Sequence, residues 1–139
     1  MPAPAGERWV AACTALEGPD AVRLQRWPRE PLGAGALRLR IEACGANFPD
    51  LLMTRDRYQL RITPPFVPGM EACGIVEEVG PGGGEFVPGT RVVAHLRHGL
   101  FTSEAVVPAA QVSRAPDGFS PAESACYRVA AFTAWNALG

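Results

Sequence analysis

The sequence predicts a mostly β fold, a partly open antiparallel barrel with one short helix and a helical C-terminal end. About seven short apolar segments recur along the chain, separated by turns rich in glycine and proline. Residues 37–43 alternate between apolar and charged side chains, and a capping-box pattern stands at Ser120. Many short strands with turn signals between them are typical of a small antiparallel barrel.

Three strands and a short helix are predicted in the first half of the chain. Strands are expected over 9–16 and 21–26, where turn residues close each apolar run. The clearest strand covers 37–43, because a helix cannot produce its period of two, and we expect its charged face to lie in water. Asn47 then predicts a helix start, and this helix is expected to continue to about Arg55.

The second half continues with short strands and changes character near its end. Strands are expected over 73–79, 91–94, 103–107 and 112–114. Glycines in 80–84 are similar to a phosphate-binding loop, but no apolar-periodic helix follows them, so we interpret them as a hairpin turn. From Ser120, a proline and a glutamate complete the capping box, which predicts one or two helices to the end of the chain.

Composition excludes several classes of protein. The 139 residues carry a formal charge of −1, and the basic residues, all arginine, are scattered singly, so nucleic acid is not an expected partner. The sequence contains no apolar run that could span a bilayer and no signal-peptide pattern at its start, which predicts a cytoplasmic protein with no membrane partner. Four cysteines lie far apart, which favours small buried side chains over a disulfide frame or a zinc ribbon.

Several separated motifs resemble one protein family. They are Gly45-Ala46-Asn47-Phe48-Pro49-Asp50-Leu51-Leu52, Arg57-Tyr58-Gln59, Pro65-Phe66-Val67-Pro68-Gly69-Met70-Glu71, Gly89-Thr90-Arg91-Val92, Pro116-Asp117-Gly118 and Ala131-Phe132-Thr133-Ala134. In order and spacing they are similar to the quinone oxidoreductase branch of the medium-chain dehydrogenase/reductase superfamily. The resemblance implies a chaperonin-10-like catalytic domain over 8–118, linking helices over 119–139, and a Rossmann domain that would follow and that this chain does not contain.

The resemblance also implies that no zinc is bound. In the zinc-dependent alcohol dehydrogenases of the superfamily, a cysteine stands at the position of Asn47 and a histidine at that of Met70. An amide and a thioether are poor substitutes for a thiolate and an imidazole as zinc ligands. His95 and His98 are not expected to bind a metal either, since no acidic or thiol partner is near them in sequence.

The implied reaction is hydride transfer from NADPH to a conjugated carbonyl, such as a quinone or an enone. NADPH would be bound mainly by the missing domain, so the isolated chain is expected to be inactive. Asn47 resembles the family asparagine near the nicotinamide ribose and the substrate, although a helix cap alone is the alternative. Thr133 is the second predicted cofactor-binding residue.

Further predicted site residues surround Asn47 in the sequence. Tyr58 is a candidate hydrogen-bond donor or aromatic lid. Asp50 is predicted as a catalytic residue, and for both Asp50 and Glu71 two interpretations stay open, polar residues of a metal-free cleft or structural hydrogen-bonding groups. The predicted substrate cleft contains Leu52, where some family members carry a tyrosine, together with Met70 and His98, for which a solvated loop position is the alternative.

Other functions remain open at this point. A stand-alone barrel could serve as a binding or assembly module that pairs through Phe132 and Trp135. The chain could also be the same portion of an enoyl reductase that acts on thioesters. For the full-length oxidoreductase we expect a homodimer with a small-molecule quinone or enone substrate. The sequence does not decide between NADPH and NADH.

Overall fold

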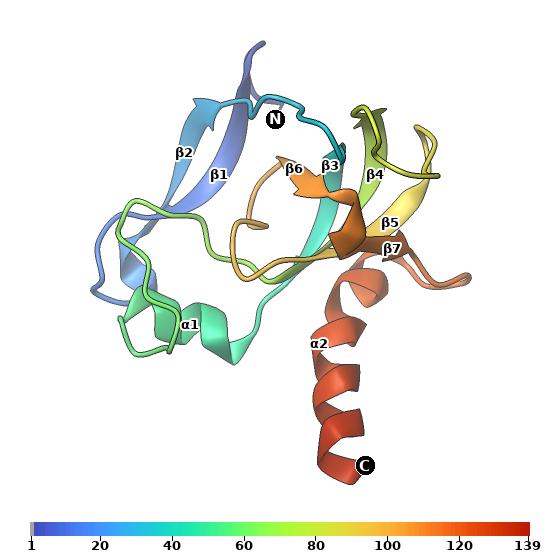
Figure 1. Cartoon of the computed structure of the whole chain (residues 1–139). Helices are drawn as coiled ribbons and strands as arrows, with labels where there is room; N and C mark the ends of the chain where they lie inside the picture. The colour runs from blue at the N-terminus through green and yellow to red at the C-terminus, as the bar shows by residue number, and fades with distance from the viewer. Residues whose placement is uncertain (1) are drawn as a thin grey trace.

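Two antiparallel sheets and two α-helices form the fold in the computed structural model, which describes residues 2–139 (Figure 1). The strands are β1 (Glu7–Cys13), β2 (Val22–Pro28), β3 (Ala36–Gly45), β4 (Glu71–Val79), β5 (Arg91–His95), β6 (Glu104–Pro108) and β7 (Val112–Arg114). The helices are α1 (Phe48–Thr54) and α2 (Pro121–Leu138), with short 3-10 helices at Pro19–Ala21 and Ala109–Gln111. β1 pairs with β2, and the larger sheet has the order β6-β3-β4-β5-β7.

The predicted fold class is confirmed, and the structure shows how far the predicted barrel closes. The two sheets are joined by isolated bridges, Val10 with Thr102 and Cys13 with Phe66, and they do not close into a barrel. β1 ends at Cys13 rather than at residue 16, and the Cys13 backbone exchanges hydrogen bonds with Phe66 in addition to pairing with Val22. The one or two helices expected at the C-terminal end are one continuous helix.

The larger sheet carries the main apolar core on its inner face. The members of this core are Leu37, Leu39, Ala72, Val76, Val92, Ala94, Leu100, Ala105 and Val107. Leu37 and Leu39 come from the alternating segment, as the period of two predicts. Burying such side chains is the main source of folding free energy. This core therefore fixes the positions of β3, which leads into α1, and of β4, which begins at Glu71.

The charged face of β3 departs from the prediction at Arg38. Its side chain is almost fully covered, with a relative exposure of 6%, although its neighbour Arg40 is exposed as expected. Arg38 Nε lies 2.9 Å from Glu78 Oε1, and Arg38 Nη1 lies 3.1 Å from Glu104 Oε2. Glu104 also accepts two hydrogen bonds from Arg29, at 2.7 and 2.8 Å. The prediction of a water-exposed face is wrong at Arg38 because strand partners and the β2–β3 loop enclose it.

Replacing Glu104 with glutamine is expected to lower the free energy of unfolding by about 2 kcal/mol at pH 7, because two arginines lose their shared counter-ion. Burial alone would raise the pKa of Glu104, but the hydrogen bonds and charges of Arg29 and Arg38 outweigh it and lower that pKa. A lowered folded pKa stabilises the fold above the unfolded pKa, and this contribution is lost as the pH falls through the folded pKa. The difference between the wild type and Glu104→Gln should therefore shrink toward pH 3.

Urea unfolding of both proteins at pH 7 and pH 3 measures this difference. Glu85→Gln provides the matched control, because Glu85 is exposed in the loop before β5. The expectation fails if Glu104→Gln unfolds at the same urea concentration as Glu85→Gln at pH 7.

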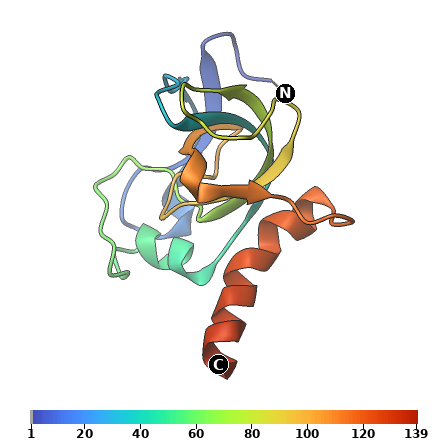
Figure 2. The ribbon, with the colours of Figure 1, turned by 45° about the vertical axis from the view of Figure 1, so that its right-hand side comes forward.

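α2 has an inner part that packs on the sheet and an outer part that stands away from it (Figures 1 and 2). The Ser120 side chain caps the helix by accepting the Glu123 N–H at 3.1 Å, which is the serine half of the predicted capping box. Ser124 and Ala125 are buried against β3 and β4, whereas Phe132 and Trp135 are 57% and 75% exposed. None of the helices within residues 2–139 is long and apolar enough to cross a membrane.

Ser124 carries a buried hydroxyl whose nearest polar side chain is a thiol. Its side chain is 1% exposed, and among the described residues its Oγ is the buried polar atom without a hydrogen-bond partner. Its neighbour is the Cys73 thiol, and thiols are weak hydrogen-bonding groups. Ser124→Ala is expected to raise the free energy of unfolding by about 1 kcal/mol, because the variant removes an unsatisfied group and favours the helix. Thermal unfolding checks this, with the exposed Ser113→Ala as control; an equal or lower melting temperature for Ser124→Ala would contradict it.

Candidate functional site

Asn47 lies where β3, α1 and β4 meet. It is the residue before the first turn of α1, with an extended backbone, and it forms a capping box with Asp50. The Asn47 backbone N–H donates to Asp50 Oδ2 at 2.8 Å, and the side-chain Nδ2 donates to Glu71 Oε1 at 3.1 Å. The helix-cap interpretation of Asn47 therefore describes part of its geometry, while its amide also reaches across to β4.

Asp50 is buried beside the start of α1. Its Oδ1 accepts the Gly69 N–H at 3.1 Å, and its Oδ2 accepts the Asn47 N–H at 2.8 Å. Burial raises the pKa of Asp50, the two backbone hydrogen bonds oppose this, and the charge of Glu71 adds to the increase. Both carboxylate oxygens thus accept a hydrogen bond from a backbone N–H group, and Asp50 fixes the start of α1 against the turn that precedes β4.

Glu71 opens β4 and is 3% exposed. Its Oε1 accepts from the Asn47 amide, and its Oε2 accepts the Val129 backbone N–H of α2 at 3.0 Å. The carboxylate thus bridges α1 and α2, which the sequence analysis did not anticipate. One sequence feature could have indicated this role, namely that Glu71 is an acidic residue which follows a tight turn and begins a mainly apolar strand.

Tyr58 and Met70, which lie twelve residues apart, share one pocket. This pocket has a volume of about 260 Å³ and is lined by Tyr58, Gln59, Leu60, Met70 and Arg97. Leu52 is half-buried on α1 and is not among the lining residues, so the structure does not bring it into this pocket. Two of the predicted residues therefore lie together beside the turn that leads into β4.

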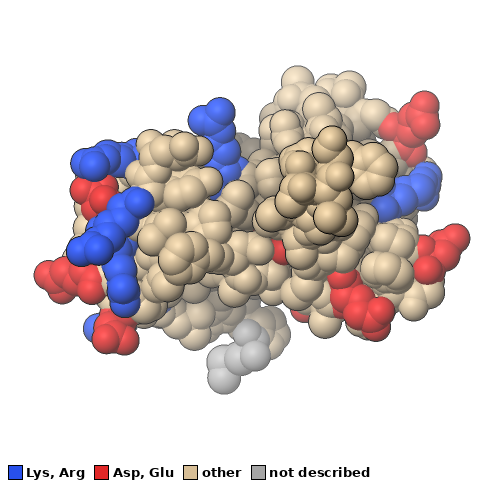
Figure 3. All heavy atoms as spheres, turned by 90° about the horizontal axis from the view of Figure 1, so that it is seen from below, with Lys and Arg blue, Asp and Glu red and all other residues tan. Residues whose placement is uncertain are grey.

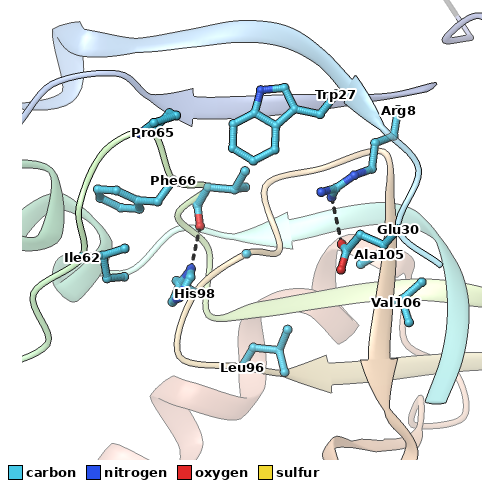
Figure 4. Close-up of a pocket in the computed structure, with 12 residues that line it drawn as sticks. Arg8, Trp27, Glu30, Ile62, Pro65, Phe66, Leu96, His98, Ala105 and Val106 are labelled. Carbon is cyan, nitrogen blue, oxygen red and sulfur yellow. Dashed lines mark hydrogen bonds and ion pairs between the residues drawn. The ribbon is translucent and has the colours of Figure 1, made fainter. Parts of the chain in front are cut away.

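His98 lines a second, separate pocket of about 370 Å³ (Figure 4). Trp27 and Phe66 form aromatic walls there, and the His98 and Phe66 rings meet edge to face with centroids 6.3 Å apart. His98 Nδ1 lies 3.3 Å from the Val67 carbonyl oxygen, and Arg8 and Glu30 form an ion pair at the other end. The predicted substrate cleft is thus divided, with Met70 in one pocket and His98 in the other.

Thr133 is exposed on the outer part of α2, one helical turn beyond Val129. Seen from the end where α2 points out, most arginines in view lie on the left, and acidic residues lie on both sides, some of them close to the helix (Figure 3). This part of α2 also carries a positive charge, because the Arg128 guanidinium lies over the Phe132 ring, 5.6 Å from its centroid.

Metal-ligand chemistry is sparse in the part of the chain that the structure describes. Within residues 2–139, His, Cys, Asp and Glu side chains form no group of three or more that could hold a metal ion. Burial and the nearby charge of Arg128 lower the pKa of His95, and the charge of Glu71 opposes this. The absence of zinc from the functional protein stays a prediction.

Comparison with known proteins finds relatives that extend beyond this chain. Residues 33–117 match the alcohol dehydrogenase GroES-like domain. The chain is 40% identical over 128 residues to the synaptic vesicle membrane protein VAT-1 homolog of Mus musculus, a match that covers 90% of this chain and 31% of that protein. It therefore spans about a third of the length of that curated relative.

Solved structures agree with this match. The human synaptic vesicle membrane protein VAT-1 homolog-like protein aligns with a TM-score of 0.91 at 29% identity, over 96% of this chain and 43% of that chain. The quinone oxidoreductase from Thermus thermophilus, determined also as its complex with NADPH, aligns with a TM-score of 0.78 at 35% identity, over 95% of this chain and 40% of that one.

Proposed function

Because the chain belongs to the alcohol dehydrogenase GroES-like domain family, within the oxidoreductases of the medium-chain dehydrogenase/reductase superfamily, we propose that it is the N-terminal catalytic-domain portion of an NADPH-dependent quinone or enone oxidoreductase. The observation that carries this proposal is the match of 95% of the chain, at 35% identity, to a quinone oxidoreductase whose complex with NADPH is known.

The residues of this chain would position the reactants. NADPH, when bound, supplies the hydride. Asn47 is held rigidly at the start of α1 and would contact the nicotinamide ribose, with Thr133 approaching from α2. Tyr58 lies in the pocket beside Met70, where its hydroxyl would donate to the oxygen on which negative charge develops. Positioned donors of this kind stabilise the transition state without a metal.

The remaining features of the proposal concern partners. The substrate is a small quinone or enone, neither nucleic acid nor a membrane is a partner, and the full-length protein is a cytoplasmic homodimer. Among these features, the pairing of several arginines with glutamates supports the exclusion of nucleic acid as a partner.

The proposal is tested with the natural-length protein from which this sequence comes. We expect it to oxidise NADPH with a 1,4-quinone or an enone and to contain no stoichiometric zinc. Oxidation with an acyl thioester alone would assign the enoyl reductase function instead. No oxidation with any acceptor would overturn the enzyme proposal in favour of a binding module, and one tightly bound zinc per chain would overturn the metal-free mechanism.

Tyr58→Phe is expected to lower kcat about 10²-fold in that assay, because the variant removes one donor to the developing oxyanion. Tyr127→Phe is the matched control, since Tyr127 packs against Phe119 on the inner part of α2. Steady-state kinetics with the preferred acceptor give both values. An unchanged kcat in Tyr58→Phe would remove Tyr58 from the reaction.

A further inference from the structure

The carboxylate of Glu71 is enclosed on three sides. α1 contributes the Asn47 amide, α2 contributes the Val129 N–H, and β3 passes at Gly45. A Cβ on Gly45 would lie 2.5 Å from Glu71 Oε1 and 2.8 Å from the Ala125 carbonyl oxygen. The absence of a side chain at Gly45 therefore lets the carboxylate and α2 reach each other.

The chemistry of Glu71 determines how the Asn47 amide is oriented. An ionised carboxylate only accepts hydrogen bonds, so the amide must turn its NH2 group toward Glu71. The carbonyl Oδ1 of Asn47 then lies on the opposite edge, toward the first turn of α1. An amide oxygen has two lone pairs, so Oδ1 retains the capacity to accept from a ligand hydroxyl in addition to the helix.

We infer that Glu71 is a positioning residue that fixes the orientation of the Asn47 amide and joins it to α2 one turn before Thr133. The inference rests on the proposed function, in which Asn47 and Thr133 contact the cofactor. Through Glu71, the start of α1 and the middle of α2 are held at a fixed distance from each other. The second lone pair of Asn47 Oδ1 selects a ligand group that donates a hydrogen bond, such as a ribose hydroxyl.

Glu71→Gln separates this role from simple structural support. A glutamine at position 71 has the same size, but one of its two polar atoms is a donor. Its oxygen accepts from Val129 N–H and its nitrogen donates to Asn47 Oδ1, while the Asp50 N–H, which then faces the Asn47 NH2 group, keeps its hydrogen bond to the Asn47 backbone carbonyl oxygen at 3.0 Å. This arrangement requires the Asn47 amide to rotate by half a turn, so the fold is kept while the group presented to the ligand changes from acceptor to donor.

The first experiment uses NMR on the isotope-labelled 139-residue chain without any ligand. In the wild type we expect nuclear Overhauser contacts between the Asn47 NH2 protons and the Glu71 side chain. In Glu71→Gln these contacts should move to the Asp50 amide, and in Glu71→Ala the Val129 amide should exchange with solvent about tenfold faster or more. Glu77→Gln is the matched control, because Glu77 is an exposed glutamate on the same strand.

The expected shifts must occur in Glu71→Gln and not in Glu77→Gln. Freely rotating Asn47 NH2 protons in the wild type, or an unchanged set of contacts in Glu71→Gln, would overturn the inference. Because no cofactor is present, these results do not depend on whether the proposed function is correct.

A second experiment uses the natural-length protein and adds a functional measurement. Glu71→Gln is expected to raise the KM for NADPH about tenfold with a smaller change in kcat, and Glu77→Gln should leave both unchanged. An unchanged KM in an active Glu71→Gln variant would overturn the ligand-selecting role. An inactive wild type would instead contradict the proposed function, while the NMR result would still stand or fall on its own.

Discussion

Gly45→Ala is expected to lower the free energy of unfolding by about 3 kcal/mol, because the added methyl group has no space. Its carbon would lie 2.5 Å from Glu71 Oε1, 2.8 Å from the Ala125 carbonyl oxygen and 2.8 Å from Glu71 Cγ. Real Cβ atoms do not approach other atoms this closely, so either the carboxylate or the backbone of α2 must move. Movement of the carboxylate weakens the hydrogen bonds that Glu71 accepts from Asn47 and Val129, and movement of α2 weakens the one from Val129.

The size of this effect can be measured by urea unfolding of the 139-residue chain. Gly33→Ala is the matched control, because nothing lies within 4 Å of the place that its Cβ would take and its backbone is outside the left-handed region. That control should be neutral or stabilising by about 0.5 kcal/mol, since alanine restricts the unfolded chain. Equal stability of the two variants would mean that α2 adjusts without loss, contrary to the packing described at Gly45.

Local patterns in the sequence predicted most elements of the fold. The alternation around Leu39 predicted β3, and the capping box at Ser120 predicted α2, because each signal depends on neighbouring residues. The order of the strands in the larger sheet, and its failure to close, depend on contacts between distant segments. Arg38 shows why local patterns cannot predict every buried side chain. Its burial results from Glu78 and Glu104, which lie 40 and 66 positions away in the sequence.

The candidate site shows the same limit. Asn47 and Asp50 could be placed together from the sequence, since a capping box links a residue to the third one after it. The contact between Glu71 and Val129 spans 58 positions and joins a side chain to a backbone N–H, for which no residue type gives a signal. The division between the Met70 pocket and the His98 pocket also had no local signal, because it depends on how two loops fold over the sheet.

Asn47→Asp is expected to have the largest effect of these substitutions, a loss of about 4 kcal/mol in the free energy of unfolding at pH 7. The variant has nearly the same shape, but it replaces the donor that lies 3.1 Å from Glu71 Oε1 with a second carboxylate. Two carboxylates at this distance in a buried site cannot both be ionised at low cost. The buried Asp50 carboxylate, which accepts from the Asn47 backbone, adds a third acidic group nearby.

The pH dependence of this loss identifies its cause. Repulsion raises the pKa of the introduced carboxyl above its unfolded value, so its protonated form is favoured in the folded state. Its contribution to stability is present below the unfolded pKa and is lost as the pH rises through the folded pKa. The difference from the wild type should therefore be largest at neutral pH and should decrease toward pH 4.

Two matched variants separate charge repulsion from the loss of the helix cap. Asn47→Ser keeps a capping side chain without charge but removes the donor to Glu71, so it should cost about 2 kcal/mol and depend less on pH than Asn47→Asp does. Asn136→Asp makes the same chemical change on the exposed outer part of α2 and should cost about 0.5 kcal/mol. Urea unfolding of the three variants between pH 4 and pH 8 gives the comparison. A pH-independent loss in Asn47→Asp, equal to that of Asn47→Ser, would show that Glu71 does not face the Asn47 amide.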